Sequence, residues 1–258
     1  GKAEELLGHM LPKSDSGIVI ATKVGLLPSL VPGTSRLARD FSTSHIRASL
    51  EASLSRLRRE CIDLYQLHNP DVETLRSDET WTTVEKLKEA GKIKYFGVSL
   101  STSRFEPACF GDLIKNPLVS SIQIQYSLMH IDLATSIDNW ETDDCGIIAR
   151  SPFEHGFLTG KYGASEQFPA DDHRSRKFDI DTTKRVQEFL HHISAMFPDR
   201  SSAEVALLYV VSSPKITLTL FGATSAHQVR QNSKLLEKPN FTEEERMAIR
   251  QVAEKCFH

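Results

Sequence analysis

Residues 62–70 read IDLYQLHNP, a mainly apolar run that ends in a histidine and then breaks at Asn-Pro. Such a run is typical of a strand buried on both faces of a parallel sheet, so His68 is expected where a strand stops. Chemistry in α/β proteins lies at the carboxyl ends of parallel strands, and an imidazole titrates near neutral pH. His68 is therefore a candidate catalytic residue. Taken alone, a core histidine bonded to a backbone carbonyl is the commoner case, and the rest of the chain decides between the two.

Short apolar runs alternate with helical patterns along the rest of the chain. Ser42 can cap a helix, Gly91 can end one, and Thr242 with Glu245 forms a capping box at the start of the last one. Five further strands are expected at residues 18–22, 94–98, 122–126, from 147 onward, and 216–221. This alternation predicts an α/β protein with the TIM (β/α)8 barrel fold and six of its eight strands visible. We expect one barrel domain over residues 1–258, with the first two strands upstream of Gly1.

Composition points to a small-molecule ligand. The chain has 258 residues and a formal net charge of −3, which gives no bias toward nucleic acid or membranes. Its four cysteines form no CxxC pair, so we expect reduced thiols in a cytoplasmic protein and no metal site. No apolar stretch approaches the length of a membrane span. The oligomeric state stays open, because no sustained heptad pattern is present.

Polar residues follow the expected strands. At the mouth of a barrel these residues would converge. A lysine beside a histidine there can make a proton donor by lowering its pKa or by orienting a hydroxyl group. The residues that follow the strands are Lys23, His68, Ser99, one of Gln123 and Gln125, Arg150 with Ser151, and Gly222.

Two later segments suit an anionic ligand. GFLTGK at residues 156–161 can wrap a diphosphate with backbone amides and an ammonium group, although an ordinary glycine turn is the alternative. The amino end of the helix that Ser225 caps is a natural anion site.

Five segments resemble the aldo-keto reductases, which are NADPH-dependent (β/α)8-barrel oxidoreductases that reduce aldehydes and ketones. These segments are ATKVG from Ala21, DLYQLHNPD from Asp63, KIKYFGVS from Lys92, SIQIQYSL from Ser121, and ARSPFEHGFLTGKYG from Ala149. Their order and spacing match along essentially the whole chain. The resemblance implies reduction of a carbonyl to an alcohol by hydride transfer, with NADPH as the cofactor and a small carbonyl compound as the substrate.

The resemblance also assigns site residues. It makes His68 and Lys23 catalytic and places Ser99 and Gln123 against the nicotinamide carboxamide. Arg150 stands where many members stack an aromatic ring on the nicotinamide, and Ser151 follows it. The remaining cofactor positions fall into a diphosphate loop, with Phe153, Gly156, Leu158 and Lys161, and an adenosine segment, with Gly222, Thr224, Gln228 and Asn232.

Several departures from the family pattern bear on catalysis. The family's aspartate and its tyrosine, the general acid, precede the glycine that corresponds to Gly1. We expect a longer protein rather than a loss of the acid, because an open barrel would leave two unpaired edges and an exposed core. Leu100 replaces a common asparagine. Gln228 replaces an arginine that many members use against the 2′-phosphate, so a preference for NADPH over NADH is less supported.

Two other functions remain open at this stage. A barrel could keep the NADP(H) site without reductase activity and act as a sensor or partner-binding protein. A lyase or dehydratase could instead use His68 and Lys23 for proton transfer alone. The substrate cannot be named, because the loops at residues 26–35 and around Trp140 and Phe168 contain no interpretable motif.

Overall fold

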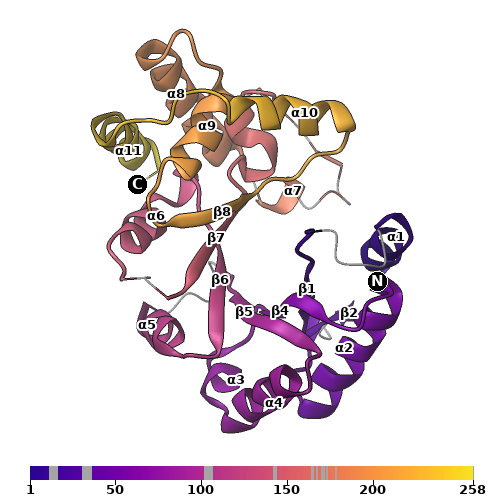
Figure 1. Ribbon diagram of the computed structural model, residues 1–258. Coiled ribbons are helices and arrows are strands. Elements are labelled where there is room, and N and C mark those ends of the chain that lie inside the picture. Colours follow the sequence, from indigo (N-terminus) through magenta and orange to yellow (C-terminus); the bar gives the residue numbers. More distant parts are fainter. Residues whose placement is uncertain are drawn as a thin grey trace. The chain divides into compact units, whose positions relative to one another are not determined.

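The computed structural model (Figure 1) contains two compact units, Gly1–Ile124 with Asp143–Gly146, and Gln125–Thr142 with Ile147–His258. It describes residues 1–11, 17–30, 37–101, 107–141, 144–163, 166, 168–169, 172, 174–177 and 179–257. None of the helices within these ranges has the length and apolar character needed to span a lipid bilayer.

The first unit is built on parallel strands. β1 (Ala21–Val24), β4 (Ile62–His68), β5 (Ile93–Ser99) and β6 (Val119–Gln125) lie in that order, and each pairs in parallel with its neighbour. Helix α1 (Lys2–Met10) precedes β1. The connections contain α2 (Thr43–Leu57), α3 (Val72–Arg76), α4 (Asp78–Glu89) and α5 (Pro107–Lys115). The predicted alternation of strand and helix is confirmed here.

Helix limits in this unit follow the predicted caps. Ser42 Oγ accepts the backbone N–H of His45 at 3.3 Å and starts α2, whose apolar side chains at helical spacing are buried. Gly91, with φ +66°, follows α4 as expected. The sequence from Ser101 to Phe110 also predicts a helix. It is observed from Pro107, and residues 102–106 lie outside the described ranges.

The prediction of the first strand was wrong in its limits. Residues 18–20 are not in the strand, which starts at Ala21 and contains Lys23. The Ile20 N–H donates to the side-chain carboxylate of Asp63 on β4 at 2.9 Å, instead of to a backbone carbonyl of a neighbouring strand. Register pairing with β4 begins with Ala21 and Leu64.

The segment after β1 was expected to be a loop and is partly a hairpin. β2 (Leu26–Leu30) and β3 (Leu37–Arg39) pair antiparallel. Pro28 is tolerated because this two-stranded sheet is all edge. Pro32 and Gly33, whose residue types also indicate a loop, lie outside the described residues.

The second unit carries a parallel pair, β7 (Gly146–Arg150) and β8 (Ile216–Leu220), surrounded by helices. The helical segments are η2 (Leu128–His130), α6 (Ile131–Asp138), η3 (Glu154–Thr159), α7 (Arg174–Lys177), α8 (Ile180–Met196), α9 (Ser202–Val211), α10 (Ala226–Leu235) and α11 (Glu243–Phe257). Helix α9 is almost wholly buried, as its apolar sequence predicts. Helix α8, capped by Asp179, was not predicted.

A buried charge cluster ties α6 to α11 in this unit. Arg246 is only 1% exposed, and its Nη2 lies 2.8 Å from the Asp138 Oδ2. Tyr126 donates to the other Asp138 oxygen at 2.8 Å, and Arg250 also pairs with Asp138. The predicted capping box fixes the start of α11, since Thr242 and Glu245 exchange backbone-to-side-chain hydrogen bonds.

Candidate active site

Three of the predicted site residues form a row across adjacent strands of the first unit. His68 at the end of β4 is the register partner of Ser99 on β5, and Ser99 is the partner of Gln123 on β6. Register partners in a parallel sheet point to the same face. Ser99 and Gln123 are buried, whereas His68 is partly exposed. A ligand that reaches His68 therefore meets a hydroxyl and an amide at the same level.

Lys23 belongs to the next row on this face. Lys23 pairs with Gln66, which stands two residues before His68 on β4. Side chains two residues apart on a strand point to the same face, so Lys23, Gln66 and His68 share one face of the sheet. Lys23 is partly exposed on β1. Its neighbour Thr22 points to the other face and donates to Glu4 of α1, which fixes the orientation of the strand.

The row that contains Lys23 is polar and tightly packed. A Cβ atom on Gly97 would lie 2.5 Å from Ser121 Oγ and 2.8 Å from the Ser121 carbonyl oxygen, so only glycine fits. Gln66 is 1% exposed, and both of its amide atoms lack a hydrogen-bond partner among the described residues. Buried polar groups of this kind need a partner, so this face suits a polar ligand or ordered water.

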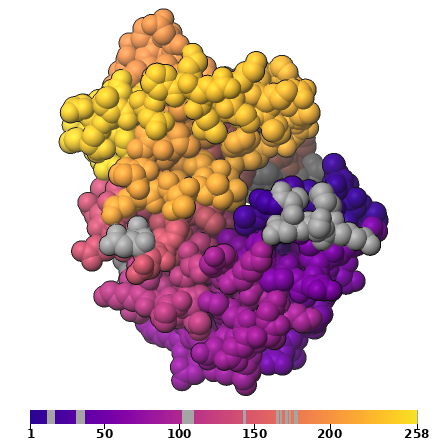
Figure 2. Space-filling model, in the orientation of Figure 1, coloured from indigo at the N-terminus to yellow at the C-terminus, as the bar shows by residue number. Residues whose placement is uncertain are grey.

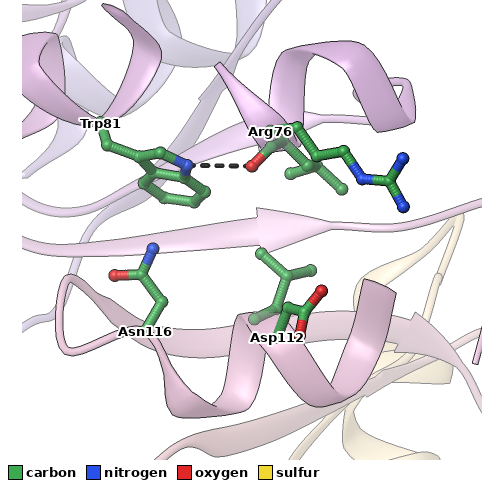
Figure 3. A pocket seen from close by; sticks show the side chains of 6 residues that line it. Arg76, Trp81, Asp112 and Asn116 are labelled. Atoms are coloured by element: carbon green, nitrogen blue, oxygen red, sulfur yellow. Dashed lines mark hydrogen bonds between the residues drawn. The ribbon is translucent and has the colours of Figure 1, made fainter. Parts of the chain in front are cut away.

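The opposite face of the sheet holds a pocket of about 190 Å³ (Figure 3). Trp81 of α4 donates to the Leu75 carbonyl at 2.9 Å and meets Phe96 edge-on. Phe96 is three residues before Ser99, so it points away from the row that contains Ser99. The pocket is lined by Leu75, Arg76, Trp81, Asp112, Leu113 and Asn116, and none of them is a predicted site residue.

The predicted diphosphate loop lies in the second unit, directly after β7. Arg150 ends β7, and Ser151 and Gly156 both have positive φ values, +60° and +97°. Phe153 packs against Phe221 with ring centroids 6.3 Å apart, which brings residue 153 beside the segment that starts at Gly222. The short helix η3 therefore has an irregular backbone, in which the N–H groups of Gly156 and Leu158 both donate to the Phe153 carbonyl, at 2.9 and 3.2 Å.

Two members of this loop differ in what they can offer. Leu158 is fully buried, so its side chain packs in the core, and its N–H donates to the Phe153 carbonyl at 3.2 Å. Lys161 is exposed, with its Nζ 5.3 Å from the centre of the Tyr162 ring. The ammonium group is thus available to an anion.

Glu154, a fully buried carboxylate at the start of η3, was not among the predicted site residues. It accepts from Gln125 Nε2 at 2.5 Å and from Ser127 Oγ at 2.7 Å, and His130 Nε2 lies 3.7 Å away. Burial lowers the pKa of Arg150, and the charge of Glu154 opposes that shift. Glu154 therefore anchors the loop and supports the cation at the end of β7.

The predicted adenosine segment is a closed turn at the start of α10. Ser225 Oγ accepts the Gln228 N–H at 3.2 Å, as expected for a helix cap. The Gln228 Oε1 accepts from both the N–H and the hydroxyl of Thr224, at 2.7 and 3.0 Å. Gly222 and Thr224 are exposed, and Asn232 lies one turn beyond Gln228 on α10. The side-chain carbonyl of Gln228 thus fixes the backbone turn between Thr224 and the start of α10.

The aldo/keto reductase family model matches residues 1–254. The chain belongs to the aldo/keto reductase family.

Individual relatives agree with this assignment. The chain is 30% identical to an uncharacterized oxidoreductase, YqkF, of Bacillus subtilis over 96% of the chain and 78% of that protein. It is 29% identical to the L-glyceraldehyde 3-phosphate reductase of Escherichia coli over 97% of the chain and 75% of that protein. The structure of the glycerol dehydrogenase AKR11B4 from Gluconobacter oxydans matches with a TM-score of 0.80 and 28% identity, over 98% of this chain and 77% of that one.

Membership of the aldo/keto reductases identifies the fold as a TIM barrel and the protein as an oxidoreductase that uses a nicotinamide cofactor to reduce carbonyl groups. The predicted site residues of this reductase fall into two groups. Lys23, His68, Ser99 and Gln123 come together in the first unit. The diphosphate and adenosine residues belong to the second unit.

Proposed function

We propose that the chain reduces an aldehyde or ketone to an alcohol with NADPH, and that His68, Lys23, Ser99 and Gln123 surround the reacting atoms. The supporting observation is the row of His68, Ser99 and Gln123 at the carboxyl ends of three parallel strands, with Lys23 in the adjoining row. Residues on strands hold their positions more precisely than residues on loops, as hydride transfer between two bound molecules requires.

Each residue of this group has a distinct role in the proposal. His68 donates a hydrogen bond to the substrate carbonyl oxygen and orients it. Lys23 places a positive charge on the same face, which lowers the pKa of a neighbouring acid. By the resemblance, the acid itself is a tyrosine.

The cofactor supplies the hydride. Ser99 and Gln123 offer a hydroxyl and an amide, which match the donors and acceptors of a carboxamide. The guanidinium of Arg150 can lie flat on the nicotinamide ring, with Ser151 beside it. The loop of Phe153, Gly156, Leu158 and Lys161 would lie over the diphosphate. Its exposed Lys161 ammonium would supply the positive charge, because the Gly156 and Leu158 N–H groups already donate to the Phe153 carbonyl. The adenosine end would be held by Gly222, Thr224, Gln228 and Asn232.

The choice of NADPH rests on the family expectation. Gln228 is neutral and its carbonyl is occupied by Thr224, so it offers a 2′-phosphate no positive charge. We therefore expect the preference for NADPH over NADH to be modest. Small hydroxylated aldehydes are the first substrates to test, because the relatives include an L-glyceraldehyde 3-phosphate reductase and a glycerol dehydrogenase.

Two broader proposals accompany this function. We propose that residues 1–258 belong to a single barrel domain, supported by a family match that spans both compact units. We also propose a cytoplasmic location, supported by the free thiols Cys61, Cys145 and Cys256.

A screen of the full protein tests the reaction. NADPH and NADH are each mixed with a panel of aldehydes and ketones, and loss of reduced nicotinamide absorbance is followed. We expect oxidation that depends on a carbonyl and is faster with NADPH. Turnover of a substrate without nicotinamide, or no oxidation with any carbonyl, would contradict the proposal.

A further inference from the structure

Three side chains of metal-binding types meet between α8 and α11 in the second unit. Glu188 and His192 lie on α8, and Cys256 lies on α11. One ligand atom from each residue, a carboxylate oxygen, an imidazole nitrogen and the thiol sulfur, lies within 4.8 Å of the other two. This cluster contains none of the residues proposed to bind NADPH or the carbonyl substrate.

The position of the cluster follows from the helix pairing. Glu188 and His192 are four residues apart, so they lie on one face of α8. Helices α8 and α11 pack against each other (Figure 1), and the rings of Phe189 and Phe257 meet at 5.3 Å. Each phenylalanine adjoins a member of the cluster, so this ring contact fixes Glu188 and Cys256 on facing helices.

The chemistry of these three groups fits zinc best. Thiolate, imidazole and carboxylate are the ligand types of protein zinc sites, and three protein ligands leave one tetrahedral position for water. We propose that Glu188, His192 and Cys256 bind a zinc ion that links α8 to α11. The site differs from a chance acidic cluster because a soft sulfur ligand and an imidazole share it with a single carboxylate.

The burial of the sulfur supports the site. Cys256 is 4% exposed, whereas Glu188 and His192 are exposed, so an ion would enter from the solvent side and meet the thiol last. The thiolate is the form of cysteine that binds a metal, so zinc binding would release the thiol proton.

A zinc ion at this site would stabilise the packing of the C-terminal helix α11 against α8. Much of the segment from α10 to α11, yellow in Figure 2, lies at the surface of the face shown. Zinc held by α8 and α11 would stabilise the folded form in proportion to its binding free energy. Carbonyl reduction does not require it, so the site can be tested separately from the proposed function.

Zinc titration of the metal-free protein tests the site. We expect one zinc ion per chain to bind in competition with a chromophoric chelator and to raise the Tm. Cobalt in place of zinc should give the thiolate-to-cobalt charge-transfer band of a Cys ligand. Cys256→Ser and His192→Ala should each weaken zinc binding by about 100-fold or more and remove the rise in Tm.

Matched controls keep the test specific. His191→Ala changes the neighbouring exposed histidine, and Cys61→Ser changes a thiol outside the cluster, so neither should alter zinc affinity. If Cys256→Ser fails to fold, Glu188→Gln and His192→Ala change exposed positions and carry the test. Zinc affinity that is unchanged in these two variants, or cobalt binding without a charge-transfer band, would overturn the proposal.

Discussion

His68 and Ser99 are register partners on the adjacent parallel strands β4 and β5, so their side chains leave the same face of the sheet at the same level. The Asn69 N–H extends this pairing beyond the strand by donating to the Ser99 carbonyl at 2.7 Å. Asn69 has φ +56°, a conformation that asparagine adopts more readily than most residues. The chain thus turns away immediately after His68 and leaves the imidazole at the end of the strand.

Replacement of Gly97 by alanine should destabilise the first unit. The added methyl group would overlap Ser121, whose carbonyl oxygen would lie 2.8 Å away, so β5 and β6 must move apart. We expect a loss of about 1–3 kcal/mol in urea unfolding. Gly111→Ala is the control, because nothing lies within 4 Å of its added Cβ and alanine favours the helix. Equal stability of the two variants would contradict this account of the row.

Replacement of Gly156 by alanine should weaken cofactor binding. Gly156 has φ +97°, and an added Cβ would lie 3.1 Å from the Tyr162 ring. The strain should cost about 1–3 kcal/mol and shift the loop proposed to hold the diphosphate. Fluorescence titration with NADPH should show a Kd raised about tenfold or more. Gly163→Ala, which meets nothing within 4 Å, should bind NADPH normally, and a normal Kd for Gly156→Ala would remove this loop from the site.

Glu4 should make stability depend on acid pH. Burial alone would raise its pKa, but hydrogen bonds from Thr22 and Arg56 outweigh burial and lower the pKa. Because the folded pKa is lowered, the stabilisation is present at neutral pH and is lost as the pH falls through the folded pKa of this carboxyl.

Glu4→Gln tests this dependence. The difference in free energy of unfolding between the unaltered chain and the variant should shrink as the pH falls below the ordinary range of a glutamate. The exposed neighbour Glu5, changed to glutamine, serves as the control and should show no such trend. A Glu4→Gln difference that stays constant with pH would refute the assignment.

Arg246→Met should destabilise the second unit. Arg246 pairs with Asp138 at 2.8 Å and donates to the Tyr209 carbonyl at 2.8 Å, so its removal takes one of two arginines from Asp138 and the guanidinium donor from the Tyr209 carbonyl. We expect a loss of about 3 kcal/mol in thermal or urea unfolding. Arg230→Met on the exposed side of α10 should stay within about 0.5 kcal/mol of the unaltered chain. If Arg246→Met lost as little free energy of unfolding as Arg230→Met, the cluster around Arg246 would add little stability.

Much of the fold could be predicted because apolar periodicity and caps are local signals. The run that ends in His68 is β4, and Ser42 caps α2, as expected. The predicted start of β1 was wrong because the Asp63 carboxylate accepts the N–H of Ile20. These two residues are 43 positions apart in sequence, so no local signal reveals the contact. Helix α8 was missed although Asp179 caps it and Val186, Phe189, Leu190 and Ile193 are buried at helical spacing.

The candidate site was predictable residue by residue but not as an arrangement. Motifs identified His68, Ser99 and Gln123, yet their common row depends on strand register, which no single segment encodes. Glu154 was missed because its burial depends on partners from β6 and the residues after it, Gln125 and Ser127. A charged residue in a loop otherwise predicts exposure.

The rate of NADPH oxidation by His68→Ala is the sharpest test of the proposed catalytic centre. With NADPH and a reactive aldehyde both saturating, we expect a rate about 10²–10⁴-fold below that of the unaltered protein. The Kd for NADPH should stay within about twofold, because Ser99 and Gln123 remain in place. His191→Ala should retain the full rate. An unchanged rate in His68→Ala would exclude His68 from catalysis and contradict the proposed centre.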